Sequence, residues 1–335
     1  MIANSSSTLN PVLKGFVLPG LPQPLLTPEA NAGYKKLRAA FEQVRGEIEA
    51  LNPDVILIYS TMWPSILGHQ VQARPELTWT HVDEEFHDLG SIPYTFQFDA
   101  SLAHQIVKEG SVRGLMMKAT DYNGFPVDTG SVVALKLVNS NLKIPAVILS
   151  SNIYSDRAET VVLGKATLQA LRAQKKTAVA IIVSSLSNRL HSEFIKPSED
   201  KIHSLKDQEW NAKILEFLEK GRLEDVAQLS RQIHKEARVK KVGNFKPFWW
   251  LSSLMGPHNR YTGEIKAYEA IYGVGAAVVG LTPALTAARD LEFDEDSPEH
   301  YSGERNVLAS MSSMGPGMSS QTLSAGEELG DSGNE

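Results

Sequence analysis

NPDVILIYSTMW, residues 52–63, carries the clearest structural signal in the chain. A residue that precedes proline is disfavoured in helical geometry, so Asn52 and Pro53 end the segment before them. Val55 to Tyr59 are apolar without alternation, which is typical of a strand buried on both faces of a parallel sheet. Ser60 to Trp63 therefore stand at the carboxyl end of a buried strand, where α/β proteins bind their ligands.

A helix precedes this strand, and further strands follow it. Apolar residues at spacings of three and four predict an amphipathic helix over residues 34–51. The apolar runs 144–150 and 177–183 are predicted to be buried strands, and residues 264–268 and 275–279 are predicted to be the closing strands. Helices that alternate with buried strands indicate an α/β fold.

Segments between these elements have weaker patterns. Residues 64–72 are predicted to form a short helix, and residues 94–98 alternate like a half-exposed strand. Residues 78–87 are polar, and residues 121–130 are predicted to be a polar loop that leads into a helix. The charged segment 207–238 is predicted to be a solvent-facing helical layer.

The composition divides the chain into three parts. We expect residues 1–13 to be a flexible N-terminus and residues 14–285 to form the folded domain. Residues 286–335 are acidic at first and then rich in Ser, Gly and Met, with almost no large apolar residue to bury. This composition predicts a disordered tail.

Charge and residue usage exclude several classes of function. The net charge of −6 gives no electrostatic case for nucleic-acid binding. The chain has no cysteine, which excludes disulfides, thiolate catalysis and Cys-based metal sites. The N-terminus lacks the pattern of a secretory signal, and the longest apolar stretch, residues 272–285, is too short to span a bilayer. We therefore expect a cytoplasmic protein with no membrane partner.

Histidines next to acidic residues provide the first candidate site. His81 and His87 lie six residues apart with three acids between them, and two His with a carboxylate can bind Fe(II) or Zn. The alternative, which we favour, is a polar surface loop whose histidines bond to backbone or to the neighbouring acids. His191 follows the strand at 177–183 on a predicted helix start, where it is either a proton carrier or, as we favour, a solvated side chain. No Gly-rich turn has the spacing of a phosphate loop, and no Ser stands in a GxSxG elbow.

The order of several motifs carries more information than any one of them. The chain contains, in sequence, FVLPGLPQPLL (16–26), PDVILIYSTMW (53–63), HVDEEFHDLG (81–90), DYNGFPVDTG (121–130), SSLSNRL (184–190), KEARV (235–239) and GEIKAYEAIYGVGAAVV (263–279). This order resembles that of the class III extradiol dioxygenases of the protocatechuate 4,5-dioxygenase β-subunit superfamily. The resemblance covers roughly residues 14–281, with DYNGFPVDTG as one of its more specific motifs.

The resemblance implies a fold and a metal site. It implies a single α/β domain whose central mixed, largely parallel sheet is flanked by helices on both faces. Active members of this family hold Fe(II) with two His and one Glu, and a further His acts as acid–base catalyst. By motif, the two ligand histidines correspond to Gly20 and Met62, the catalytic His to Asn188, and the Glu to Glu264.

These residues change what the resemblance predicts about activity. Gly20 has no side chain to donate, the Met62 thioether is a soft ligand poorly matched to Fe(II), and Asn188 cannot carry a proton. We therefore expect no catalytic residue, no bound metal and no cofactor. The resemblance implies a non-catalytic subunit that binds a homologous dioxygenase-type subunit, together with a small aromatic ligand.

Two alternatives remain open at this stage. One is an active Fe(II)-dependent ring-cleaving dioxygenase that uses His81 and His87 with Glu264. The other is a regulatory protein that binds a small molecule in the family's pocket. In each case a further set of residues is predicted to line the pocket or the subunit interface: Tyr59, Asp121, Tyr122, Asn123, Phe125, Asp128, Thr129, Trp249 and Trp250.

Overall fold

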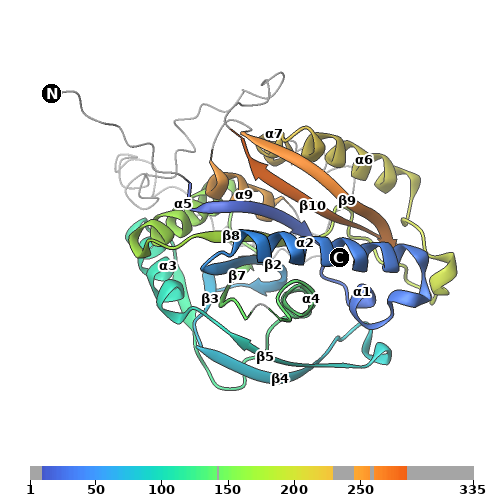
Figure 1. Ribbon diagram of the computed structural model, residues 1–335, viewed down its shortest axis with the longest axis horizontal. Coiled ribbons are helices and arrows are strands. Elements are labelled where there is room, and N and C mark those ends of the chain that lie inside the picture. Colours follow the sequence, from blue (N-terminus) through green and yellow to red (C-terminus); the bar gives the residue numbers. More distant parts are fainter. Residues whose placement is uncertain (1–9, 142, 229–244, 257–259, 285–335) are drawn as a thin grey trace, which may run out of the picture.

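A mixed eight-stranded sheet forms the centre of the molecule (Figure 1). The computed structural model describes residues 10–141, 143–228, 245–256 and 260–284. The strand order is β6-β3-β7-β2-β8-β1-β10-β9, and the four strands β7, β2, β8 and β1 run parallel to one another. The strands are β1 (Val12–Leu18), β2 (Val55–Ser65), β3 (His69–Gln72), β6 (Met117–Thr120), β7 (Ala146–Asn152), β8 (Ala178–Val183), β9 (Tyr261–Ile271) and β10 (Val274–Pro283).

Helices cover both faces of this sheet, and a separate hairpin adds to one of them. The helices are α1 (Gln23–Leu26), α2 (Ala32–Leu51), α3 (Ala100–Val112), α4 (Thr129–Val138), α5 (Arg157–Gln174), α6 (Leu205–Glu219), α7 (Leu223–Gln228) and α9 (Lys246–Met255). Short 3₁₀ turns are η1 (Pro28–Ala30), η2 (His87–Leu89) and η3 (Pro197–Glu199). Strands β4 (Glu76–Val82) and β5 (Ser91–Gln97) pair only with each other among the described strands, and Figure 1 shows this hairpin below α4. The predicted α/β domain with a largely parallel sheet is confirmed.

The α2–β2 unit forms as the sequence predicts. The Asn31 side chain caps the start of α2, and Asn52 ends the helix with a left-handed backbone (φ 45°), a conformation that asparagine tolerates. Along β2, Val55, Leu57 and Tyr59 face one core. Ile56 and Ile58 face the other, because successive side chains of a strand point to opposite faces.

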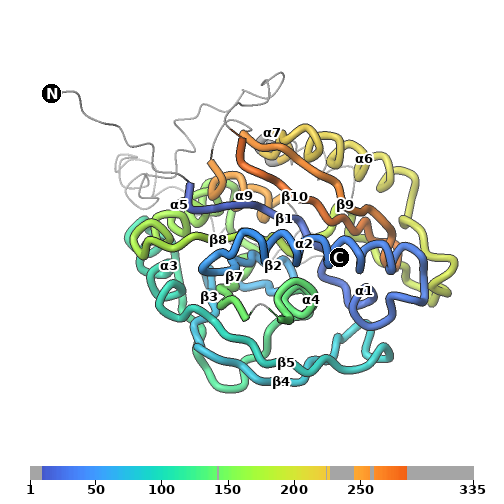
Figure 2. Tube along the Cα trace, in the orientation of Figure 1, coloured from blue at the N-terminus to red at the C-terminus, as the bar shows by residue number. Residues whose placement is uncertain are grey.

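Each face of the sheet has its own hydrophobic core. One contains buried residues of α3, α5, α7 and α9, and the other contains those of α2, α4 and the β4–β5 hairpin. The first and last described strands meet in the sheet, since β1 pairs antiparallel with β10 (Figure 2). This pairing brings the loop after β1 close to the turn of the β9–β10 hairpin. The two segments are more than 200 residues apart in sequence.

Three local predictions were wrong. Residues 64–72 form the end of β2 and all of β3, because Ser65 pairs with Asn152 of β7 and Gly68 turns the chain with a positive φ of 71°. Residues 76–82 form β4, because an antiparallel partner, β5, pairs with the polar segment. His191 lies in an irregular loop, where its backbone N–H bonds to the Tyr272 carbonyl, so no helix starts there.

Some predictions fall outside the described residues. They are the flexibility of residues 1–9, the part of the charged helical layer at 229–238, and the tail at 286–335. Residues 10–13 of the predicted flexible segment do lie in the described chain, and there Val12 begins β1. None of the described helices combines the length and the apolar composition needed to cross a membrane.

Candidate functional site

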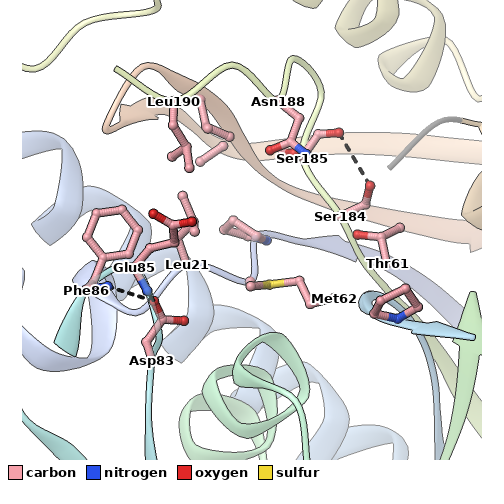
Figure 3. Close-up of a pocket in the computed structure, with 15 residues that line it drawn as sticks. Leu21, Thr61, Met62, Asp83, Glu85, Phe86, Ser184, Ser185, Asn188 and Leu190 are labelled. Carbon is pink, nitrogen blue, oxygen red and sulfur yellow. Dashed lines mark hydrogen bonds between the residues drawn. The ribbon is translucent and has the colours of Figure 1, made fainter. Parts of the chain in front are cut away.

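A cavity of about 280 Å³ lies at the carboxyl ends of β1, β2 and β8 (Figure 3). Ligands in α/β proteins bind at this edge of the sheet, because the loops that leave neighbouring parallel strands meet there. Most of the wall comes from residues at or just beyond strand ends. The lining residues are Pro19, Gly20, Leu21, Thr61, Met62, Pro64, Asp83, Glu85, Phe86, Ser184, Ser185, Asn188, Leu190, Val274 and Ala276.

Gly20, Met62 and Asn188 line this same cavity. The sequence motifs assign these three residues to the positions of the family's two iron-ligating histidines and its acid–base histidine. They come from three different strand exits, and Figure 3 shows Met62 and Asn188 on opposite sides of the cavity. The structure therefore brings together three of the four positions that the sequence singled out.

Met62 fills the space beside Gly20. A β-carbon built on Gly20 would stand 2.5 Å from the Met62 sulfur, 2.8 Å from Val183 Cγ1 and 2.9 Å from the Gly130 α-carbon. A β-carbon on Gly130 would in turn stand 2.8 Å from the same sulfur. The thioether is thus packed between two glycines, and no side chain fits at position 20 while Met62 keeps this conformation.

Glu264 lies outside the cavity. It stands on β9 opposite Gly280, and its side chain is 62% exposed. Its carboxylate pairs with the Lys266 ammonium at 2.8 Å, and Lys266 also pairs with Glu47 of α2. Glu264 is therefore part of a surface ion pair, because the register of β9 turns its side chain away from the cavity.

The cavity residues do not fit the two-His, one-carboxylate iron site. Gly20 and Met62 provide neither imidazole nor oxygen ligand, and Asn188 provides a neutral amide. Among the described residues, no group of three His, Cys, Asp or Glu is arranged to hold a metal ion. His81, His87 and Glu264 are all described residues, so the structure does not assemble the alternative ligand set.

His81 belongs instead to a hydrogen-bonded chain with Thr129 and Asp83. The Thr129 hydroxyl donates to Asp83 Oδ2 at 2.6 Å, so the bond of 2.6 Å between Thr129 Oγ1 and His81 Nε2 must be donated by His81. Asp83 Oδ1 also accepts the backbone N–H groups of Glu85 and Phe86, at 3.0 and 2.9 Å. This chain ties the end of β4 to the start of α4, which is a structural role.

Asp128, the residue before Thr129, also has a structural role. Its carboxylate caps α4 by accepting the Ser131 N–H at 3.0 Å and accepts the Ser60 hydroxyl at 2.7 Å. Ser60 stands at the point where β2 leaves its regular pairing with β7. Asp128 therefore fixes the orientation of α4 relative to the strand that carries Met62.

The other predicted pocket residues do not line the cavity. Tyr59 is fully buried and packs on Trp250 with ring centroids 5.5 Å apart, in the core beneath α9, and burial raises the pKa of its hydroxyl. Phe125 packs between Trp63 and Tyr122, at 5.7 and 5.9 Å, in the loop before α4. Asp121 and Asn123 are exposed in that loop, and Trp249 packs at the border of the α9 core.

A second cavity of about 480 Å³ adjoins the first. The sequence did not predict this second cavity. Glu85, Phe86 and Leu190 line both cavities. The remaining wall residues are Gln23, Thr27, Tyr34, Asp88, Leu89, His191, Ser192, Phe194, Ile195, Pro197 and Tyr272. They come from segments far apart in sequence, so no local pattern could have indicated the site.

Comparison with known proteins adds independent information. A family model described as the catalytic LigB subunit of aromatic ring-opening dioxygenase matches residues 21–280. The 2-aminophenol 1,6-dioxygenase alpha subunit of a Pseudomonas species is 32% identical over 271 residues, which cover 80% of this chain and 98% of that protein. The beta subunit of the same name, also from a Pseudomonas species, is 31% identical over 287 residues, covering 80% and 93%.

A solved structure is similar in fold. The crystal structure of an uncharacterized protein from Escherichia coli K12 matches with a TM-score of 0.56 at 14% sequence identity. The match covers 80% of this chain and 99% of that chain. At this identity the likeness concerns the fold alone.

Proposed function

The chain belongs to the LigB family of aromatic ring-opening dioxygenase subunits, as its motifs predicted, and from that premise we propose that it is a metal-free, non-catalytic subunit. It would pair with a homologous dioxygenase-type subunit in the metabolism of aromatic compounds. The observation that carries the proposal is the packing of Met62 against Gly20. Met62, at the position of the second ligand histidine, occupies the space that a side chain at position 20, the first ligand position, would need.

The chemistry of the remaining cavity residues supports the same proposal. Asn188 lines the cavity where the family's acid–base histidine is expected, and a carboxamide neither gains nor loses a proton near neutral pH. Asp83, the buried carboxylate of the wall, already accepts three hydrogen bonds. It therefore has few lone pairs left for a metal.

The partner part of the proposal rests on the relatives. The two curated relatives are named as alpha and beta subunits of one dioxygenase, and the chain matches them almost equally, at 32% and 31% identity. A chain of this kind is therefore expected to work beside a second subunit of the same fold. A small aromatic ligand fits the apolar part of the cavity wall, which includes Leu21, Met62 and Phe86.

Iron content is the direct test of the non-catalytic part. The purified protein is incubated with Fe(II) without oxygen, desalted, and analysed for iron, beside a family member that has histidine at both ligand positions. We expect the control to retain iron close to one equivalent and this chain to retain almost none, with an unchanged circular dichroism spectrum. Stoichiometric iron in this chain would contradict the proposal, and its loss in a His81→Gln variant would support the alternative ligand set.

Co-expression tests the partner part separately. The chain is produced together with a homologous subunit from the same genome, and the mixture is analysed by size-exclusion chromatography with light scattering. We expect a stable complex that contains both chains and has ring-cleaving activity from the partner. Two separate species at micromolar concentration would contradict the pairing, whatever the iron result.

A further inference from the structure

The second cavity has no part in the proposed function, and its walls point to a ligand of a different kind. It lies between the start of α2, the η2 turn after β4, the loop after β8 and the tight β9–β10 turn. Its volume of about 480 Å³ falls within the range of small-molecule sites.

Aromatic rings form much of the wall, and three of the four are held in place by contacts. Tyr34, Phe86, Phe194 and Tyr272 all line the cavity, and the Phe86 and Tyr272 rings meet edge to face with centroids 5.2 Å apart. Asp200 fixes two of these residues, because it accepts the Tyr34 hydroxyl at 2.6 Å and the backbone N–H of Tyr272. Tyr34, Phe86 and Tyr272 are therefore positioned before any ligand arrives, which lowers the entropic cost of binding, whereas Phe194 is largely exposed.

The charge on the wall is negative. Glu85 and Asp88 line the cavity, whereas no lysine or arginine is among its lining residues. Within the described part of the chain, neither carboxylate forms an ion pair. A cationic ligand would therefore meet two carboxylates without competition from a resident ammonium or guanidinium group.

Gln23 adds a buried polar group to this wall. Its side chain is 4% exposed, and its amide oxygen has no hydrogen-bond partner among the described residues. A buried acceptor without a partner is unfavourable, so Gln23 is a strained part of this wall. Two other polar wall groups have partners: His191 Nε2 donates to the Lys201 carbonyl, and the Tyr272 hydroxyl donates to the Glu193 carbonyl.

From these observations we propose that the second cavity binds a small organic cation, an ammonium group carried on an apolar or aromatic body. The faces of aromatic rings attract ammonium groups, most strongly where water is excluded. The carboxylates of Glu85 and Asp88 complement the charge. An anion would meet the Glu85 and Asp88 carboxylates, with no lysine or arginine on the wall to offset them.

Three probes of equal size and different charge test the proposal. Isothermal titration calorimetry at neutral pH measures the binding of 2-phenylethylammonium, 2-phenylethanol and phenylacetate to the full chain. We expect the cation to bind at least about tenfold more tightly than the other two, and more weakly as salt is raised. Equal binding of all three, tighter binding of phenylacetate, or no binding of the cation at millimolar concentration would each overturn the proposal.

Variants locate the site. Asp88 lines only the second cavity, so Asp88→Asn is expected to weaken cation binding about threefold to tenfold. Glu84→Gln is the matched control, because Glu84 is an exposed neighbour that lines neither cavity, and we expect no change. Met62 lines only the first cavity, so Met62→Leu is also expected to leave cation binding unchanged.

The opposite pattern of variants overturns the assignment. If Met62→Leu weakens cation binding and Asp88→Asn does not, the ligand occupies the first cavity. If Glu84→Gln weakens binding as much as Asp88→Asn, the effect is one of overall charge. Neither pattern depends on iron content or on a partner subunit, so this inference and the proposed function can fail separately.

Discussion

The sulfur of Met62 lies 2.5 Å from the point where a β-carbon on Gly20 would stand. Met62 lies near the carboxyl end of β2, and Gly20 lies in the loop after β1. By motif the two residues correspond to two ligands of one metal ion. Their substitutions are complementary in volume, since the larger side chain takes the space that the smaller one leaves free. Restoring only one histidine would therefore create a clash or leave an incomplete ligand set.

The variant Gly20→Ala tests this packing. The added methyl group would meet the Met62 sulfur, Val183 and the Gly130 backbone, and it cannot be accommodated without displacing at least one of them. We expect the free energy of unfolding to fall by about 1–3 kcal/mol, as for other overpacked cores. Urea denaturation followed by circular dichroism measures the change.

A second glycine provides the matched control for that variant. Gly46 lies inside α2, and a β-carbon there would meet nothing within 4 Å. Gly46→Ala is therefore expected to stabilise the protein by about 0.5–1 kcal/mol through higher helix propensity. Adding Met62→Ala to Gly20→Ala should recover part of the loss. If Gly20→Ala behaves like Gly46→Ala, the packing described here is wrong.

The burial of His69 leads us to predict that the free energy of unfolding depends on pH. It is 2% exposed on β3, and neither ring nitrogen has a hydrogen-bond partner among the described residues. Burial, with a smaller effect from the Lys246 ammonium, lowers the pKa of His69 from 6.5 to about 4. The unfolded chain therefore takes up this proton at a higher pH than the folded chain does. Stability should fall as the pH is lowered from about 6.5 to about 4, by about 3 kcal/mol in total from this residue.

Urea denaturation at a series of pH values, for the wild type and two variants, measures the effect. His69→Gln removes the titrating group and should flatten the pH dependence in this window. His104→Gln is the control, because His104 is exposed on α3 and should leave the dependence as it is in the wild type. An unchanged slope in His69→Gln would show that other groups cause the acid sensitivity.

The ion pairs of Lys266 provide a test of whether Glu264 has a structural role or is a metal ligand. The Lys266 side chain is 2% exposed and pairs with Glu47 and Glu264, whose side chains are 28% and 62% exposed. Burial by itself would raise the pKa of the Glu47 carboxyl, but the ammonium groups of Lys14 and Lys266 outweigh it and lower this pKa. Glu47 is therefore the carboxylate that compensates the buried lysine.

Two neutral substitutions separate the contributions of these carboxylates. Glu47→Gln should lower the free energy of unfolding by about 1–3 kcal/mol, because it leaves a buried ammonium with a weaker partner. Glu264→Gln should change it by no more than about 0.5 kcal/mol, as for an exposed ion pair. Neither should change iron content. Iron that the wild type retained and that Glu264→Gln alone lost would restore Glu264 as a ligand and contradict its position outside the cavity.

Elements with a strong local pattern were predictable. The buried strands β2, β7 and β8 and the amphipathic helix α2 have periodicities that depend only on neighbouring residues, and each forms close to its predicted limits. The end of β2 and all of β3 were not predictable in this way. Their strand geometry depends on pairing with β7 and β6, which lie about fifty to ninety residues further along the chain.

The candidate site was predictable in part for the same reason. Met62 lies near the carboxyl end of β2, and Gly20 and Asn188 lie in the loops after β1 and β8. Parallel strands bring their carboxyl ends to one edge of the sheet. Glu264 was misplaced, because the direction of a strand side chain depends on register, and a shift of one residue moves it to the opposite face.

The sequence by itself determined the chemical inventory of the protein. It shows that the chain contains no cysteine, and its motifs predict Gly20, Met62 and Asn188 where the family has its ligand and acid–base histidines. It also determined the alternation of helices and strands, because both follow from short-range periodicity. These properties need no knowledge of distant contacts.

Only the tertiary structure decided what occupies the site and what surrounds it. The packing of Met62 between Gly20 and Gly130, the ion pair of Glu264 with Lys266, and the second cavity all join segments far apart in the chain. Such contacts depend on strand order, register and volume, which are properties of the assembled sheet and its cores. A sequence pattern specifies which residues are present, and the fold decides which of them meet.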